Sequence, residues 1–159
     1  MAHLPETFTL DIYGTGDAAY VRMLEMRARL SNGRIRLHGH VEGAAKAAAF
    51  AQADLFVLPS HSENFGIVVA EALAHAAPVL TTQNTPWHDL DRNGCGRCID
   101  LPRSHLAAEI AALAAGDLAE MGQRGRAWMR RDFSTTAMVD GFAALYRALV
   151  MQRRQAAVA

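Results

Sequence analysis

The sequence has little of several features that mark large classes of protein. Among its 159 residues are two cysteines and one lysine, and no apolar run approaches the roughly 18 residues that a membrane-spanning helix needs. The first residues show neither the basic nor the apolar stretch of a secretion signal. Sixteen basic residues balance sixteen acidic ones, which argues against the basic surface typical of nucleic-acid-binding proteins. We therefore expect a cytoplasmic protein with no nucleic-acid partner and no transmembrane segment, peripheral to a membrane at most within a longer protein.

The rest of the composition is that of an ordinary globular protein. Hydrophobic residues make up 51% of the chain and charged residues 20%, which excludes disorder, collagen and coiled coil. A chain of this length corresponds to about one domain. We expect residues 1–159 to form a single domain.

Short apolar runs alternate with segments of helical periodicity along the chain. The runs that predict strands are 7–13, 35–38, 54–58, 78–82 and 97–101. The segments that predict helices are 18–30, 43–53, 66–75, 104–115, 118–132 and 135–154, so closing helices run from about 117 to 154. This alternation is typical of a parallel sheet covered on both faces. The predicted fold class is α/β, a Rossmann-like α/β/α sandwich with a parallel sheet of about five strands.

Ligands of such sheets bind beyond the carboxyl ends of the strands, so the loops that follow the strands are the first places to look for a site. The loop after the first strand contains Gly14 and Gly16, and its sequence up to Ala19 formally matches the dinucleotide fingerprint G-x-G-x-x-A. Asp17, however, would place a negative charge where a pyrophosphate binds. A nicotinamide-binding oxidoreductase module and a plain tight turn are the two alternatives for this loop.

The segment 58–73 is the richest in polar groups. Glu63 and Asn64 lie in the loop after the third predicted strand, and Phe65, Gly66 and Ile67 open a helix whose first backbone N–H groups have no partner within the helix. Glu71 follows eight residues after Glu63, on a broad common face. Two carboxylates beside a helix N-terminus suit a ligand with both hydroxyl and phosphate groups, such as a nucleotide sugar. The alternative is a non-catalytic interaction domain in which Glu63 caps the helix and Glu71 is a solvated surface acid.

The two cysteines form the motif Cys95-Gly-Arg-Cys98, which raises the question of a redox or zinc site. Zinc would need two more ligands, and His88 and His105 lie without finger-like spacing. A thioredoxin-like motif should begin a helix, whereas Cys98 opens an apolar run that predicts a strand. We therefore favour two reduced thiols around a turn.

The motif Glu63-x7-Glu71, within Pro-Ser-x-x-Glu-x-Phe-Gly and followed by Ala-Glu-Ala-Leu and Pro-Val-Leu-Thr-Thr, resembles the donor-binding half of retaining glycosyltransferases of family 4, the group 1 type with the GT-B fold. The runs 10–16, 35–41, 93–96 and 121–134 also resemble this family, so the resemblance covers nearly the whole chain.

The resemblance implies a role for each matching residue. Glu63 is expected to act at the transferred sugar, as the catalytic residue, and Glu71 to hold the ribose hydroxyls. Asn64 is expected in the same substrate-binding loop, and the backbone N–H groups of residues 65–67 are expected to meet the sugar or the diphosphate. Gly14 and Gly16 match a turn near the donor, and Val41 matches a position beside the base.

The family transfers a sugar from a nucleotide diphosphate with retention, and neither a metal nor another cofactor is expected. The Arg and Lys that bind the diphosphate in the family lie in a segment before the part that this chain resembles, and Lys46 is not expected at the site. The resemblance therefore implies a donor domain without its first strand and helix. It also implies that the acceptor-binding domain comes from an N-terminal domain or a partner chain. The donor base, the sugar and the acceptor are left open.

Overall fold

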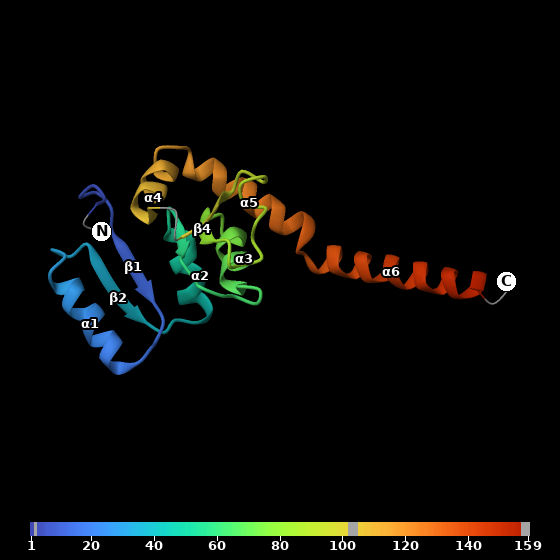
Figure 1. Ribbon diagram of the computed structural model, residues 1–159, viewed down its shortest axis with the longest axis horizontal. Coiled ribbons are helices and arrows are strands. Elements are labelled where there is room, and N and C mark those ends of the chain that lie inside the picture. Colours follow the sequence, from blue (N-terminus) through green and yellow to red (C-terminus); the bar gives the residue numbers. More distant parts are fainter. Residues whose placement is uncertain (2, 102–104, 157–159) are drawn as a thin grey trace.

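The computed structural model describes residues 1, 3–101 and 105–156 of the chain, and the side chains among them up to residue 153. The chain folds into five parallel strands and six helices within these ranges (Figure 1). The strands are β1 Leu10–Tyr13, β2 Ile35–Gly39, β3 Phe56–Leu58, β4 Val79–Thr82 and β5 Gly96–Ile99. The helices are α1 Ala18–Arg29, α2 Gly43–Gln52, α3 Ile67–Ala74, α4 Leu106–Ala114, α5 Leu118–Asp132 and α6 Thr135–Ala156.

Each predicted strand and helix is found, with differences at the ends. The first strand begins at Leu10 rather than at residue 7, because Phe8 donates its N–H to Pro5 O (3.1 Å) in a turn. The predicted start of the fourth helix, Ser104, lies outside the described residues. The closing helices α5 and α6 lie where the periodicity places them.

The α/β class with parallel strands is confirmed, but the strands form two sheets rather than one. One sheet has the order β1-β2 and the other the order β3-β4-β5. Both crossovers from strand to helix to neighbouring strand are local: α1 joins β1 to β2, and α3 joins β3 to β4. Among the described residues no strand lies between β1 and β3 and pairs with both of them. The predicted continuous sheet is therefore interrupted at that point.

The two sheets differ in how they are covered. We call residues 10–39, with β1, α1 and β2, the N-terminal unit, and residues 50–133 the main body. The buried residues of both hydrophobic clusters belong to the main body, from Phe50 to Met129. All four residues of β4 are buried, whereas α1 buries none. The core therefore lies around β4, beneath the loop that follows β3.

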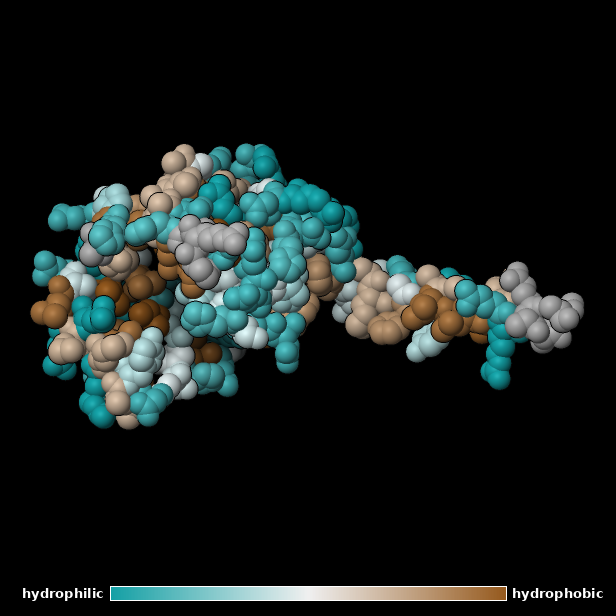
Figure 2. Space-filling model, in the orientation of Figure 1, coloured by the Kyte–Doolittle hydropathy of each residue, from teal (hydrophilic) through white to brown (hydrophobic). Residues whose placement is uncertain are grey.

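Helix α6 extends away from the rest of the molecule (Figure 1). Large apolar side chains along it are exposed, and Figure 2 shows hydrophobic residues on its surface. These residues are Met138, Val139, Phe142, Leu145, Tyr146, Leu149, Val150 and Met151. None of the described helices is long and apolar enough to cross a membrane.

Candidate functional site

The loop between β3 and α3 is held in place by β4. The buried Thr81 hydroxyl donates to Leu58 O (2.9 Å), and the buried Thr82 hydroxyl donates to Ser60 O (2.5 Å). Glu63 N donates to Asn84 O (3.3 Å) from the loop after β4. Because buried polar groups are costly to leave unpaired, these bonds fix the course of the loop directly above the core.

Gly66 sets the start of α3, and Glu63 does not cap it. Gly66 is the N-cap residue in the left-handed conformation (φ 68°, ψ 59°), a position that glycine occupies without strain, and no side chain caps the helix. The Glu63 carboxylate instead accepts a hydrogen bond from Ser60 Oγ at Oε1 (3.0 Å). The alternative in which Glu63 serves as a helix cap is therefore wrong, and the helix begins at Ile67, one residue later than predicted. Val69 N donates to Gly66 O (2.9 Å), so the N–H groups of α3 that precede the first helical turn are those of Ile67 and Val68.

Trp87 fixes the backbone just before α3, a role that was not predicted. Its indole Nε1–H donates to Phe65 O (2.6 Å), and its ring lies against the Phe65 and Phe133 rings (centroids at 5.2 and 5.4 Å). A Cβ on Gly66 would lie 3.5 Å from Nε1. The signal that could have revealed Trp87 is a large aromatic residue within a loop otherwise composed of turn-forming residues.

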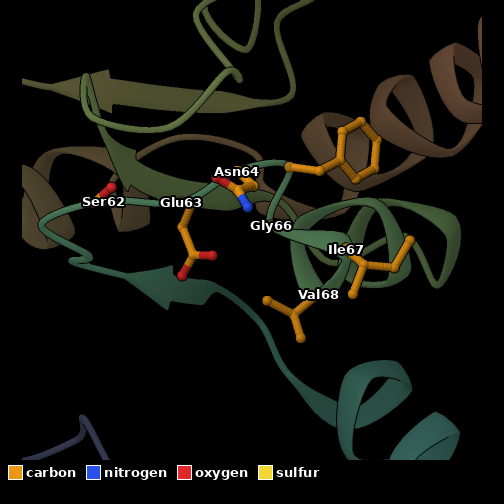
Figure 3. A pocket seen from close by; sticks show the side chains of 7 residues that line it. Ser62, Glu63, Asn64, Gly66, Ile67 and Val68 are labelled. Atoms are coloured by element: carbon orange, nitrogen blue, oxygen red, sulfur yellow. The ribbon is translucent and has the colours of Figure 1, made fainter.

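An open pocket of about 600 Å³ lies at the N-terminus of α3. It is lined by Ser62, Glu63, Asn64, Phe65, Gly66, Ile67 and Val68. In Figure 3 the Glu63 carboxylate and the Val68 side chain point toward the same space, while Ile67 points away from Glu63. The pocket thus brings together one carboxylate and the start of a helix, an arrangement that can stabilise positive charge at one point and bind an anion at another.

Glu71 lies further along α3 and does not line this pocket. It pairs with Lys46 of α2: the Lys46 ammonium donates to Oε1 (2.8 Å) and lies 2.7 Å from Oε2. Both side chains are about one third exposed, at 33% and 34%. Glu71 is thus a partly exposed acid held in an ion pair rather than a free surface carboxylate. Packing of α2 against α3 joins residues 25 positions apart, so Lys46 contacts a predicted site residue although it lies outside the pocket lining.

The other predicted site residues lie at the carboxyl ends of β1 and β2, outside the pocket lining. Gly14 (φ 129°) donates its N–H to Gly39 O (2.7 Å), which ties the loop after β1 to the end of β2. Gly16 follows in the same loop, and Val41 is half-buried between β2 and α2. The structure therefore brings residues 63–67 together and leaves Gly14, Gly16 and Val41 in the loops that follow the strands of the neighbouring sheet.

The start of α1 is already occupied by its own N-cap. Asp17 Oδ1 accepts hydrogen bonds from Ala19 N (2.8 Å) and Tyr20 N (3.2 Å). These are the N–H groups that a pyrophosphate would bind in a dinucleotide fold, so this arrangement argues against the nicotinamide alternative.

The cysteines are two free thiols, as expected. Cys95 is fully buried, and burial raises the pKa of its thiol to about 12. Burial also raises the pKa of Cys98, whose sulfur lies 3.8 Å from His88 Nδ1. A thiol with a raised pKa stays protonated at neutral pH, and it is therefore a poor nucleophile and a poor metal ligand. Nowhere in the described ranges do three His, Cys, Asp or Glu side chains gather as a metal site would require.

Comparison with known proteins gives a family match over most of the chain. The model of a family described as glycosyl transferases group 1 matches residues 1–116. A D-inositol 3-phosphate glycosyltransferase of Segniliparus rotundus is 38% identical over 109 residues, which cover 66% of this chain and 24% of that protein. The chain thus spans about a quarter or less of the first curated relatives, with 20% and 24% of their lengths covered.

Solved structures resemble the chain in fold. HepE of Anabaena in complex with UDP matches with a TM-score of 0.76 at 20% identity, over 92% of this chain and 43% of HepE. The C-terminal domain of LpcC, a group 1 family glycosyl transferase of Francisella tularensis, matches with a TM-score of 0.64 at 15% identity, over 84% of this chain and 90% of that domain. The fold is therefore that of a GT-B C-terminal domain.

Proposed function

The chain belongs to the group 1 glycosyl transferases, and from this premise we propose that it binds a nucleoside diphosphate sugar and takes part in transfer of the sugar with retention of configuration. The observation that carries the proposal is the pocket at the start of α3, where Glu63 stands beside the backbone N–H groups that open the helix. The complex of the similar HepE fold with UDP supports the same ligand class.

In the proposed reaction the Glu63 carboxylate lies near the anomeric carbon and stabilises the positive charge that develops there as the bond to the diphosphate breaks. Ser60 Oγ, which donates to Glu63 Oε1, fixes the direction of the carboxylate. The negative charge of the leaving diphosphate is stabilised by the N–H groups and dipole at the start of α3. Glu71 accepts hydrogen bonds from the ribose hydroxyls, and Asn64 adds a polar contact in the same loop. These steps use groups of the chain alone, and we propose that no metal or other cofactor takes part.

The first test is calorimetric titration of the chain with UDP, GDP and ADP. We expect at least one of them to bind, and Glu71→Ala to weaken that binding by about 1 to 3 kcal/mol, or about 5- to 150-fold, as for a lost hydrogen bond to a charged acceptor. Glu25→Ala removes an exposed acid from α1 and serves as the matched control. Absence of binding by all three nucleotides to folded protein contradicts the proposal.

The second test measures the slow hydrolysis by this chain of a nucleotide sugar that carries whichever base binds in the first test. We expect Glu63→Gln to lower the turnover about 100-fold while nucleotide affinity changes little, because the carboxylate acts on charge that develops only in the transition state. NMR of the released sugar gives the configuration of the first product. A first product of inverted configuration contradicts retention.

We also propose that the chain works with a further segment that fills the interruption between β1 and β3. Many doubly wound folds have the strand order 3-2-1-4-5-6. Removal of strand 1 from this order leaves a pair and a triplet, which is the observed division. Figure 2 shows hydrophobic surface in the hollow between the N-terminal unit and the rest of the molecule. A parallel strand from an N-terminal acceptor-binding domain or a partner chain is the proposed occupant.

The edges of β1 and β3 give this second proposal a direct test. Leu10 N and Phe56 N donate to Arg34 O and Pro78 O in the neighbouring segments, so the N–H groups of Asp11 and Val57 point toward the interruption. In a chimera, the stretch of the Segniliparus rotundus protein that comes before its matched region is fused to the start of this chain. We expect the amides of Asp11 and Val57 to become protected from hydrogen exchange. A scrambled stretch is the control, and equal exchange in both chimeras contradicts the proposal.

A further inference from the structure

The single lysine of the chain pairs with the second acid of the Glu63-x7-Glu71 motif. The Lys46 ammonium donates to Glu71 Oε1 (2.8 Å) and lies 2.7 Å from Oε2. Oε2 is closed to solvent and accepts no hydrogen bond from the described residues. The carboxylate is thus held by one cation that approaches both oxygens.

The surroundings of this pair are acidic. Glu42 is the N-cap residue of α2, and its pKa is lowered chiefly by the hydrogen bond and the charge of His40 and to a smaller extent by the charge of Lys46. Glu63 lies in the loop that precedes the helix of Glu71. A nucleoside diphosphate would bring further negative charges beside these acids, and like charges at close range repel one another.

We propose that Lys46 is a positioning residue that orients Glu71 for the ribose and cancels its charge, so that a diphosphate can bind nearby. This inference rests on the proposed function, because it concerns the same nucleotide. The ammonium occupies one side of the carboxylate and leaves the remaining lone pairs of Oε1 to accept from a ligand hydroxyl. It also gives the site a cation that the sequence did not lead us to expect.

A purely structural role makes a different prediction. An ion pair that is one third exposed contributes little to the free energy of unfolding. A structural pair would therefore change nucleotide binding only through a small general loss of stability. A positioning and charge-neutralising role instead makes the effect depend on the charge of the ligand.

The test compares UDP, UMP and uridine, or the corresponding series of whichever base binds, by calorimetry. Lys46→Met keeps the length of the side chain and removes the charge. We expect it to weaken diphosphate binding at least fivefold and nucleoside binding less than threefold. Lys46→Arg keeps the charge, and we expect it to stay within threefold of the wild type for every ligand. Arg22→Met changes the net charge equally on α1 and is the control.

A double variant separates the charge effect from the lost ribose contact. We expect Glu71→Gln to weaken binding of uridine and UDP alike. We expect Lys46→Met to weaken UDP binding by a smaller factor in the Glu71→Gln background than in the wild type, because no carboxylate remains for the ammonium to orient. Thermal unfolding of each variant confirms that it is folded.

The outcomes divide clearly. Wild-type affinity for the diphosphate in Lys46→Met, tighter binding, or an equal loss for nucleoside and diphosphate each overturns the inference while the proposed function stands. If the wild-type chain binds no nucleotide at all, the proposed function fails and this inference fails with it.

Discussion

The two sheets of the molecule are built alike but are covered very differently. In each, parallel strands are joined through a helix, yet α1 of the N-terminal unit buries no residue while α3 of the main body buries Val69, Ala72 and Leu73. β1 is mostly exposed, and β4 is buried along its whole length. Local sequence is thus enough to form a strand-helix-strand unit, and burial depends on what packs against it.

The difference places the proposed chemistry in the part of the molecule that has the buried core. The loop with Glu63 stands on β4 and on the Trp87 ring, both part of the core. Gly14, Gly16 and Val41 belong to or border the N-terminal unit, which contributes nothing to the two buried clusters. We infer that the sugar side of the site is formed by this chain alone, and that the side near the base depends on what covers the N-terminal unit.

The largest expected contrast comes from the same substitution at one glycine in each sheet. A Cβ on Gly96 (φ 153°) would lie 1.9 Å from Val79 O, whereas a Cβ on Gly14 (φ 129°) meets no atom within 4 Å. We expect Gly96→Ala to lower the free energy of unfolding by about 3 to 5 kcal/mol, through overlap and strain, and Gly14→Ala by about 1 kcal/mol, through strain alone. Urea unfolding measures both, and similar losses would contradict the contrast.

A second contrast uses one leucine of α3 and one leucine of α1. Leu73 of α3 is fully buried, and Leu24 of α1 is only half-buried. We expect Leu73→Ala to cost about 2 to 5 kcal/mol because it leaves a cavity, and Leu24→Ala to cost about 1 kcal/mol. Chemical denaturation of both variants provides the measurement. A larger loss at Leu24 would show that the N-terminal unit has a core of its own.

The main body also carries a buried group that titrates at high pH. The folded protein raises the pKa of Cys95 from 9.0 to about 12, so folding favours the protonated thiol. This contribution to stability is complete below pH 9 and is lost as the pH rises toward 12. In that range the thiol of the unfolded chain has lost its proton while the folded protein still holds it, which favours unfolding. We expect Cys95→Ala to unfold with a shallower loss of stability between these pH values than the wild type. An unchanged slope would contradict burial of the thiol.

The smallest expected effect has the opposite sign and lies in α6. A Cβ on Gly141 meets no atom within 4 Å, whereas a Cβ on Gly122 of α5 would lie 1.8 Å from Ala76 O. We expect Gly141→Ala to raise the free energy of unfolding by about 0.5 to 1 kcal/mol, because alanine is more favourable than glycine in an exposed helix. Circular dichroism during urea unfolding detects it. A loss of stability would mean that α6 packs against something at this position.

Elements with a strong local pattern were predictable, and contacts between distant elements were not. The apolar run 54–58 and the turn residues after it located β3 and the loop with Glu63. The strand pattern shows where each strand lies along the chain but not which strands are neighbours in the sheet. The interruption beside β1 was therefore not visible in that pattern. The pair of Lys46 with Glu71 arises only where α2 packs against α3, and the bond from Trp87 to Phe65 O joins two loops. No periodicity records such contacts.

The bond between the Trp87 indole and Phe65 O has a practical consequence. Trp87 is 2% exposed, yet its N–H and its ring both touch a residue that lines the pocket. An occupant that displaces Phe65 changes the polarity around the indole and hence its fluorescence. Indole fluorescence would thus register a pocket occupant that moves Phe65. Trp87→Phe removes this signal and also changes the surroundings of Trp128, whose ring centroid lies 5.7 Å from that of Trp87.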